Sequence, residues 1–165
     1  MDEAKASQDF FHAQIPITRA MGVQVVAADT KRFVVEAPVA LNHNHMQTGF
    51  GGSVNAIATL AGYGCLWMRL RERAADVVIQ ESSIRFIRPI VKTIRAVCDV
   101  AAVERLPAFL EEVRANTTGR IKLTVRVEEN GIAAAEFRGT FVALPRSGGR
   151  GDPKLQPRIG RRSNG

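Results

Sequence analysis

Apolar and polar residues alternate along several short segments of the chain, a pattern typical of strands with one buried face. Residues 23–28 and 33–39 form two such segments, joined by the polar turn DTKR. Two more follow at 77–90 and 93–103. Residues 120–144 form a third pair around Asn-Gly, the preferred dipeptide for a tight hairpin turn. The pattern therefore predicts six strands.

The segment 52–73 has the length of a helix but lacks a polar face. Its first charged residue is Arg69, and large apolar residues fall on several faces between small ones. A helix of this composition is predicted to be buried all round. Gly62 and Gly64 each cost this helix about 1 kcal/mol relative to alanine. We expect that cost to reflect the close approach of a neighbouring backbone.

Two shorter helices are predicted at 7–15, before Pro16, and at 106–116. The predicted order is then a helix, two strands, one long helix, and four strands with a short helical insert. This order is typical of an α+β fold in which an antiparallel sheet packs against one main helix.

Most of the positive charge lies at one end of the chain. The net charge is +7, and residues 145–165 carry six basic residues against Asp152 alone. This end is rich in glycine and proline, so we expect one domain over 1–144 and a disordered basic tail over 145–165. Because the remaining residues are almost neutral, the charge does not indicate a nucleic-acid partner.

Location follows from what the sequence lacks. The N-terminal residues do not have the pattern of a secretory signal, and the longest apolar run, 56–68, is too short to span a bilayer. Cys65 and Cys98 lie in apolar surroundings without C-x-x-C spacing, so we expect them to be small buried hydrophobic residues. The sequence predicts a cytoplasmic protein without a membrane partner.

Three segments together resemble the hotdog-fold thioesterases, in which a curved antiparallel sheet wraps one long central helix. They are the entry segment IPITRAMGVQVV, the glycine pair at the start of the long helix, and FIRPI, which is similar to an F-x-R-P strand segment. The segment NHNHMQTGFGGS, followed by LAGYG, resembles the putative-thioesterase subfamily also found fused behind GNAT-type acetyltransferase domains. The resemblance covers residues 15–144 and implies the hotdog fold and a thioester substrate.

The resemblance does not extend to every site residue. Hotdog thioesterases of the phenylacetyl-CoA type have an Asn, a Gly three residues later, a His-Gly-Gly, and a helix carboxylate. Asn44 and the pair Gly51-Gly52 match this motif, which lies in the loop over residues 41–51 and at the start of the long helix. Gln47 replaces the first Gly, Phe50 replaces the His, and Thr59 stands where the carboxylate is expected.

A thioesterase must polarise the thioester carbonyl and deliver water. Backbone N–H groups of Gly51 and Gly52 would lie at a helix N-terminus and could form an oxyanion hole, or the glycines could simply permit a tight turn. Asn44 can hold water, and His45 is the nearest general base, although it could equally be a loop histidine. Thr59 could orient water or bond the carbonyl four residues before it.

Charged residues near FIRPI complete the candidate set. Glu81 could supply the missing carboxylate if its strand face turns toward the pocket, or it could pair with Arg85. Arg85 and Arg88 point to opposite faces. The resemblance implies that one of them meets coenzyme A phosphates, and a solvated arginine is the alternative. His43 and His45 have no third ligand in reach, so neither a metal nor a cofactor is expected.

The leading hypothesis is a thioesterase acting on acyl-CoA or acyl carrier protein. A catalytically silent acyl-thioester-binding module would explain the missing carboxylate directly. A hotdog dehydratase or hydratase would need an acid that Thr59 does not supply. The resemblance also implies a homo-oligomer, a dimer or a dimer of dimers, with sites formed between subunits.

Overall fold

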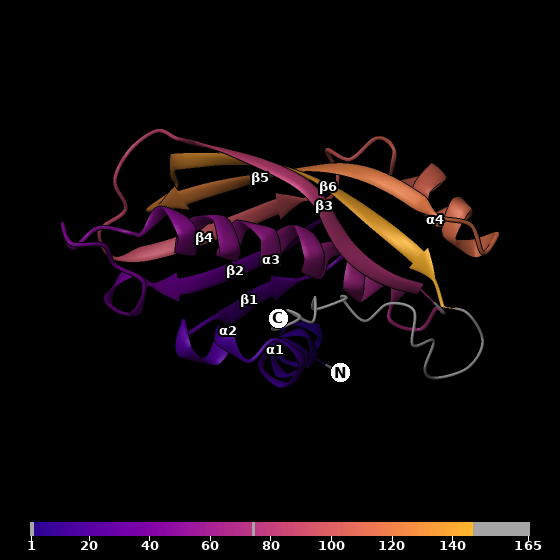
Figure 1. Ribbon diagram of the computed structural model, residues 1–165, viewed down its shortest axis with the longest axis horizontal. Helices are drawn as coiled ribbons and strands as arrows, with labels where there is room; N and C mark the ends of the chain where they lie inside the picture. Colours follow the sequence, from indigo (N-terminus) through magenta and orange to yellow (C-terminus); the bar gives the residue numbers. More distant parts are fainter. Residues whose placement is uncertain (1, 74, 147–165) are drawn as a thin grey trace, which may run out of the picture.

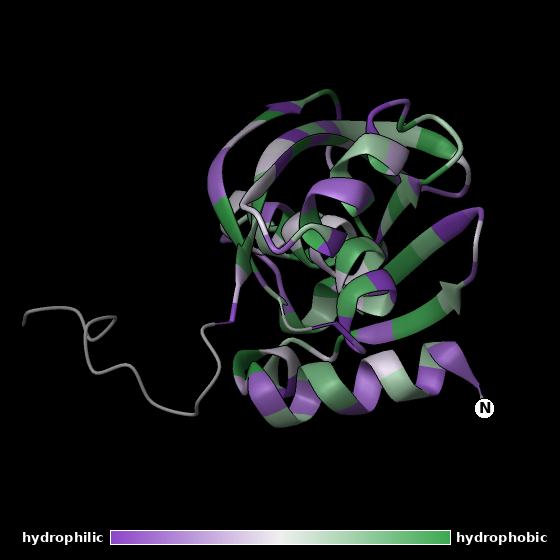
Figure 2. Ribbon diagram, turned by 90° about the vertical axis from the view of Figure 1, so that its right-hand side faces the viewer, coloured by the Kyte–Doolittle hydropathy of each residue, from purple (hydrophilic) through white to green (hydrophobic). Residues whose placement is uncertain are grey.

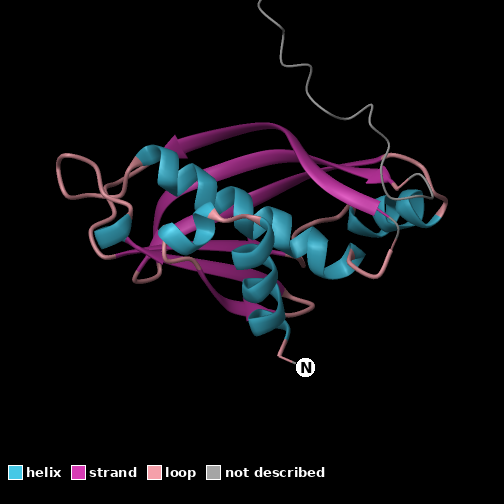
Figure 3. Ribbon diagram, turned by 60° about the horizontal axis from the view of Figure 1, so that its bottom comes forward, coloured by secondary structure: helices cyan, strands magenta, loops and turns pink. Residues whose placement is uncertain are grey.

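Six antiparallel strands form one sheet in the computed structural model, which describes residues 2–73 and 75–146. The strands follow one another across the sheet in the order β1-β2-β4-β5-β6-β3. Their bounds are Gln24–Ala28 (β1), Arg32–Pro38 (β2), Ala75–Phe86 (β3), Thr93–Asp99 (β4), Gly119–Glu129 (β5) and Ile132–Pro145 (β6). The sheet curves around α3, Gly51–Leu70 (Figures 1 and 3). This arrangement confirms the predicted α+β fold with one long central helix.

The buried side of α3 packs against strands β2 to β6. A Cβ added at Gly64 would lie 2.3 Å from Cε1 of Phe33, and one at Gly62 would lie 2.8 Å from Cζ of Phe141. Both rings are fully buried. The prediction that a neighbouring backbone approaches closely is therefore wrong. The glycines are needed because aromatic side chains of the sheet pack against the helix at these two positions.

The prediction that α3 is buried all round is wrong along one stripe. Gly52 is exposed, and Ala56, Thr59, Tyr63 and Trp67 are half-buried at spacings of three or four residues. Such residues share one face of a helix. This face looks toward the segment around α2, Ile17–Ala20, and the edge of the sheet at β3, and no strand covers it completely.

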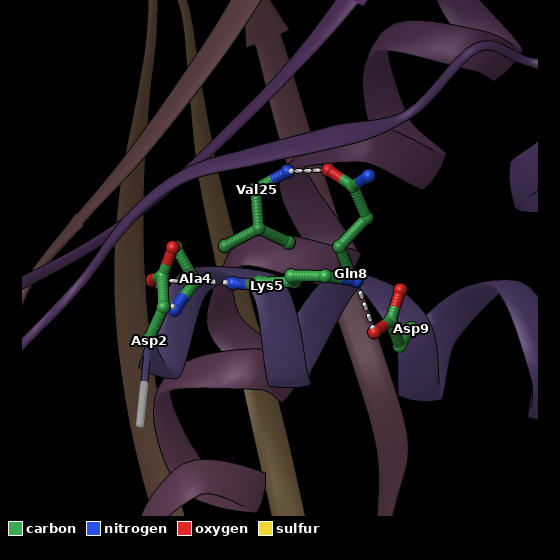
Figure 4. Close-up of polar contacts among 6 residues, drawn as sticks. All are labelled: Asp2, Ala4, Lys5, Gln8, Asp9 and Val25. Carbon is green, nitrogen blue, oxygen red and sulfur yellow. Dashed lines mark hydrogen bonds and ion pairs between the residues drawn. The ribbon is translucent and has the colours of Figure 1, made fainter.

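The N-terminal helix α1, Glu3–Gln14, begins earlier than the sequence pattern predicted. Asp2 caps it, accepting a hydrogen bond from the backbone N–H of Ala4 at 3.0 Å. Gln8 Oε1 accepts from the backbone N–H of Val25 in β1 at 3.0 Å (Figure 4). Hydrophilic and hydrophobic residues alternate along this helix, as expected for one that packs on a single face (Figure 2). Thus α1 is tied to the β1 edge of the sheet.

The hairpin and the inserted helix agree with the sequence. Asn130 and Gly131 have φ of 51° and 76°, and a type I′ turn requires positive values at both positions. The inserted helix α4 spans Leu106–Arg114 and carries Pro107 in its first turn. Strands β3 and β4 end earlier than predicted, at Phe86 and Asp99.

The last strand reaches Pro145, and the Arg146 guanidinium lies 2.7 Å from the Asp76 carboxylate. Beyond Arg146 the predicted basic tail lies outside the described residues. Both cysteines are fully buried, as predicted. The hydrogen bond with Cys65, together with burial, raises the pKa of the Cys98 thiol well above its ordinary value. No helix within the described ranges is long and apolar enough to cross a membrane.

Candidate active site

The loop that leads from β2 into α3 is shaped by Asn44. Its Oδ1 accepts from the backbone N–H groups of Met46 (2.8 Å) and Thr48 (3.2 Å), and its Nδ2 donates to Thr48 Oγ1 (3.0 Å). Gln47 lies within this turn at φ of 60°, a conformation that favours glycine. His45 is exposed on the same turn. Asn44 thus uses its amide to fold the loop that carries His45.

A buried amide that the sequence analysis did not single out fixes the base of this loop. Asn42 is 3% exposed, and its Nδ2 donates to the carbonyl oxygens of Met21 and Pro38, each at 2.8 Å. The Asn42 carbonyl in turn accepts from the backbone N–H of Phe50 at 2.8 Å. Asn42 therefore sets where α3 begins. In the sequence, Asn42 could have been noticed as a polar residue between an apolar segment and the histidines.

The start of α3 presents backbone N–H groups without a cap. The first helical bond runs from Val54 N to Phe50 O at 2.9 Å, and no side chain caps the end. The N–H groups of Gly51, Gly52 and Ser53 precede that bond, so they have no partner within the helix. Together with the helix dipole they favour negative charge at this point.

Two phenylalanine rings lie against the glycine pair. A Cβ added at Gly52 would lie 2.4 Å from the Phe50 ring, and one at Gly51 would lie 3.2 Å from the Phe86 ring. The glycines therefore let both rings approach the helix backbone. The rings border the N–H groups with apolar surface, and both rings are 54% exposed, so the helix start remains open to solvent.

A cavity of about 410 Å³ opens beside this helix start. Gly51 and Arg88, both predicted as site residues, line it together, with Thr48 from the loop. The backbone N–H of Gly49 donates to the Ile90 carbonyl at 2.8 Å, which joins the loop to the segment after β3. The structure thus brings FIRPI and the Gly-Gly turn to one place.

The segment after β3 is held by Glu129, a second residue that sequence reasoning missed. Its carboxylate accepts from the backbone N–H groups of Val91 (3.2 Å), Lys92 (2.6 Å) and Thr93 (3.1 Å). Desolvation alone would raise the pKa of Glu129, but these three hydrogen bonds outweigh it and lower the pKa. Its position one residue before the hairpin turn was no signal, because the donors lie far away in sequence.

Thr59 lies in a different cavity from Arg88. Its Oγ1 donates to the Asn55 carbonyl at 2.9 Å, the helix-internal bond that was one of its two interpretations. It lines a cavity of about 470 Å³ between α3, β3 and the segment around α2. Thr59 and Gly52 share the half-open stripe of α3, but within the described chain the two cavities have no lining residue in common.

Glu81 and Arg85 lie on the face of the sheet that is turned away from α3. Glu81 pairs with Thr140 across β3 and β6, and its Oε1 accepts from Thr140 Oγ1 at 3.1 Å. Arg85 lies opposite Glu136 in the register of the same two strands. Within one subunit, neither side chain is brought to the cavity beside Gly51.

Solved structures share this architecture. A putative thioesterase from Shewanella oneidensis is 26% identical, with a TM-score of 0.79 and coverage of 88% of this chain and 100% of its own. A Pseudomonas aeruginosa protein described as a probable thioesterase is 21% identical, with a TM-score of 0.73 and coverage of 86% and 95%. A variant of the phenylacetic acid degradation protein PaaI from Thermus thermophilus is 19% identical, with a TM-score of 0.55 and coverage of 77% and 97%. The last two likenesses concern the fold alone.

A family model covers nearly all of the described chain. Residues 4–145 match YiiD_C, whose description is "putative thioesterase". The match includes the loop, the Gly-Gly turn, α3 and the segment after β3. The chain therefore belongs to the YiiD_C family of putative thioesterases and has their hotdog fold.

Proposed function

We propose that this chain hydrolyses an acyl thioester of coenzyme A or of acyl carrier protein, with the thioester oxygen held at the start of α3. The observation that carries the proposal is the set of uncapped N–H groups of Gly51, Gly52 and Ser53, of which Gly51 lines a cavity of about 410 Å³. As water attacks the carbonyl carbon, negative charge develops on the oxygen. Fixed backbone donors in an apolar frame stabilise that charge.

Water delivery is assigned to the loop. His45 takes the proton of the attacking water and gives it to the thiolate that leaves when the C–S bond breaks, and Asn44 holds the turn in which His45 lies. We expect His45→Ala to lower kcat by about a hundredfold or more. Thr59→Ala should change kcat far less, because the Thr59 hydroxyl is bonded to the Asn55 carbonyl and lies in a different cavity from Gly51. Glu81 and Arg85 receive no role in this scheme, since they face away from α3.

The oxyanion hole can be tested by removing one N–H group. Phe50 has φ of −64° and ψ of 129°, which suits a residue that precedes proline, and proline is tolerated in the first turn of a helix. Gly51→Pro removes the donor, while Gly51→Ala introduces a similar Cβ contact with Phe86 and keeps the donor. We expect kcat of the proline variant to be about a hundredfold below that of the alanine variant. Equal kcat values would exclude the Gly51 donor.

Arg88 supports coenzyme A as the carrier of the acyl group. It lines the same cavity as Gly51, where its guanidinium could meet a phosphate. Arg88→Ala should raise KM for an acyl-CoA and leave KM unchanged for the same acyl group on N-acetylcysteamine, which has no phosphate. If both KM values rise equally, Arg88 does not recognise the nucleotide end of the substrate.

One observation favours a second candidate, an acyl-thioester-binding module without turnover. Thr59 replaces the helix carboxylate of the related motif, and its hydroxyl is bonded within the helix. Binding of acyl-CoA without hydrolysis, across short, long and aromatic acyl groups and acyl carrier protein, would select this candidate. Under either function we propose a cytoplasmic homo-oligomer, at least a dimer.

A further inference from the structure

The second cavity offers a hydrocarbon surface. Its volume is about 470 Å³, and most of its lining is aliphatic or aromatic. The hydroxyl of Thr59 already donates to the Asn55 carbonyl at 2.9 Å, and that of Thr18 donates to the Ile15 carbonyl at 2.8 Å. A polar ligand would lose hydration here without gaining comparable hydrogen bonds. An alkyl chain is the occupant that matches this chemistry.

The cavity lies on the same face of α3 as Gly52, one of the proposed carbonyl-binding donors, and its α3 lining begins at Ala56. Ala56, Thr59 and Tyr63 line it, and they follow Gly52 at spacings of four, three and four residues on the half-open stripe of α3. Tyr63 lies eleven residues after Gly52, or about 16 Å along the helix. A thioester whose oxygen is bound at the start of α3 can therefore lay its acyl chain along this stripe.

Tyr63 forms the far wall of the cavity. It also lines a neighbouring cavity of about 250 Å³, together with Phe10, Trp67 and the Asp76–Arg146 pair. The Tyr63 and Phe10 rings are stacked with centroids 6.5 Å apart, and Phe10 stacks on Trp67 at 4.2 Å. Val77 also borders both cavities. Tyr63 and Val77 thus lie between an apolar cavity and one that contains charged groups.

We propose that Tyr63 sets the length of the acyl chain that this site accepts, and that the substrate class is a medium-chain acyl thioester, octanoyl to dodecanoyl. The inference rests on the proposed function and extends it. A chain of this length fills the space between the start of α3 and the Tyr63 ring. A longer chain has to displace the ring or leave the cavity.

The test compares substrates of different length on Tyr63 variants. For wild type we expect kcat/KM to be highest for octanoyl- to dodecanoyl-CoA and to fall for hexadecanoyl-CoA. Tyr63→Ala joins the two cavities, so the ratio of hexadecanoyl to octanoyl kcat/KM should rise at least tenfold. Tyr63→Phe keeps the ring and should keep the wild-type ratio. Tyr63→Leu, which preserves an apolar side chain, replaces the alanine variant if that one does not fold.

Trp67, the only tryptophan of the chain, provides a readout that does not depend on hydrolysis. Non-hydrolysable alkyl thioethers of coenzyme A should change its emission when the alkyl chain is dodecyl and not when it is ethyl. An unchanged length ratio in a folded Tyr63→Ala or Tyr63→Leu variant would overturn the inference. If wild type hydrolyses no thioester, the proposed function fails. The inference about Tyr63 is then tested by thioether binding alone: it holds if Tyr63→Ala binds long alkyl chains better relative to short ones than wild type does, and it is overturned if the two proteins show the same length dependence.

Discussion

Gln47 occupies a backbone position that suits glycine. Its φ is 60°, and the related motif has Gly at the corresponding place. A side chain in this conformation crowds the neighbouring carbonyl, which costs about 1–2 kcal/mol. The bonds that Asn44 makes to Met46 and Thr48 hold the turn in spite of that cost. The side-chain amide of Asn44 therefore holds the loop that carries His45 in a conformation that strains the backbone of Gln47.

Replacing Gln47 with glycine should relieve this strain. We expect Gln47→Gly to stabilise the fold by about 1 kcal/mol, which raises Tm by about 2–4 °C in a domain of this size. Differential scanning calorimetry measures the change. Asn130→Gly is the matched control, because Asn130 has φ of 51° but asparagine tolerates this conformation. If Tm rises equally in both variants, relief of strain at Gln47 is not the cause of the stabilisation.

Residues of the site could be predicted where their partners are close in sequence. The position of Gly51 and Gly52 at the start of α3 followed from a glycine pair directly before an apolar helix. Asn42 and Glu129 were missed because their main contacts, Met21 and residues 91–93, come from distant segments. Glu81 could be placed on a strand but not on a face, since the register shift between Ile79 and Glu81 changes which residues face α3.

Alternation predicted the six strands and the hairpin, since a strand with one buried face has a period of two. It did not predict the strand ends. The chain leaves the sheet at Phe86, where the N–H groups of Ile87 and Arg88 both donate to the Ala134 carbonyl. Nor could composition show that one stripe of α3 stays open, because that stripe is apolar like the rest of the helix.

The segment between β3 and β4 depends on a third element for its shape. Glu129, at the end of β5, binds the N–H groups of residues 91–93, and Ile90 accepts from Gly49. This clamp connects the hairpin end of the sheet to the cavity wall that carries Arg88. A loss of the clamp should therefore affect stability and substrate affinity together.

The clamp predicts a pH-dependent stability. Because the folded pKa of Glu129 is lowered, its contribution is present above the ordinary glutamate pKa and is lost as pH falls through the folded pKa. We expect Glu129→Gln to lower Tm at neutral pH, with the difference from wild type shrinking as pH falls below the ordinary glutamate pKa of about 4.3 and vanishing below the lowered folded pKa. Glu104→Gln, at an exposed carboxylate, is the control. A difference that persists unchanged in acid would mean that the charge of Glu129 is not responsible.

The two edges of the sheet differ in how they are covered. The β1 edge is occupied by α1, whose Gln8 accepts from Val25, and β1 is only five residues long. Strand β3 has twelve residues and is paired on one side only, with β6. Val78 and Ile79 on this strand are 46% and 38% exposed. A long edge that carries exposed apolar residues and has no partner strand among the described residues favours association with another strand.

Pairing of two β3 strands would also affect the cavity that we propose for the acyl chain. Val78 and Ile79 line the cavity that ends at Tyr63. A second subunit paired with β3 would therefore cover the β3 side of this cavity. Closure removes water from around the thioester and strengthens the interactions of the carbonyl oxygen with the start of α3. We therefore expect dimerisation and turnover to be linked.

We therefore predict a dimer in which β3 of one chain pairs with β3 of a second copy. Light scattering at micromolar concentration should give about twice the chain mass of 18.0 kDa. Val78→Lys places a charge on the free edge and should yield a monomer with little activity, since edge lysines oppose strand pairing. Val26→Lys on β1, at a position 42% exposed, should leave the dimer intact. A wild-type mass near 18.0 kDa, or a fully active Val78→Lys monomer, would show that the site is complete within one chain.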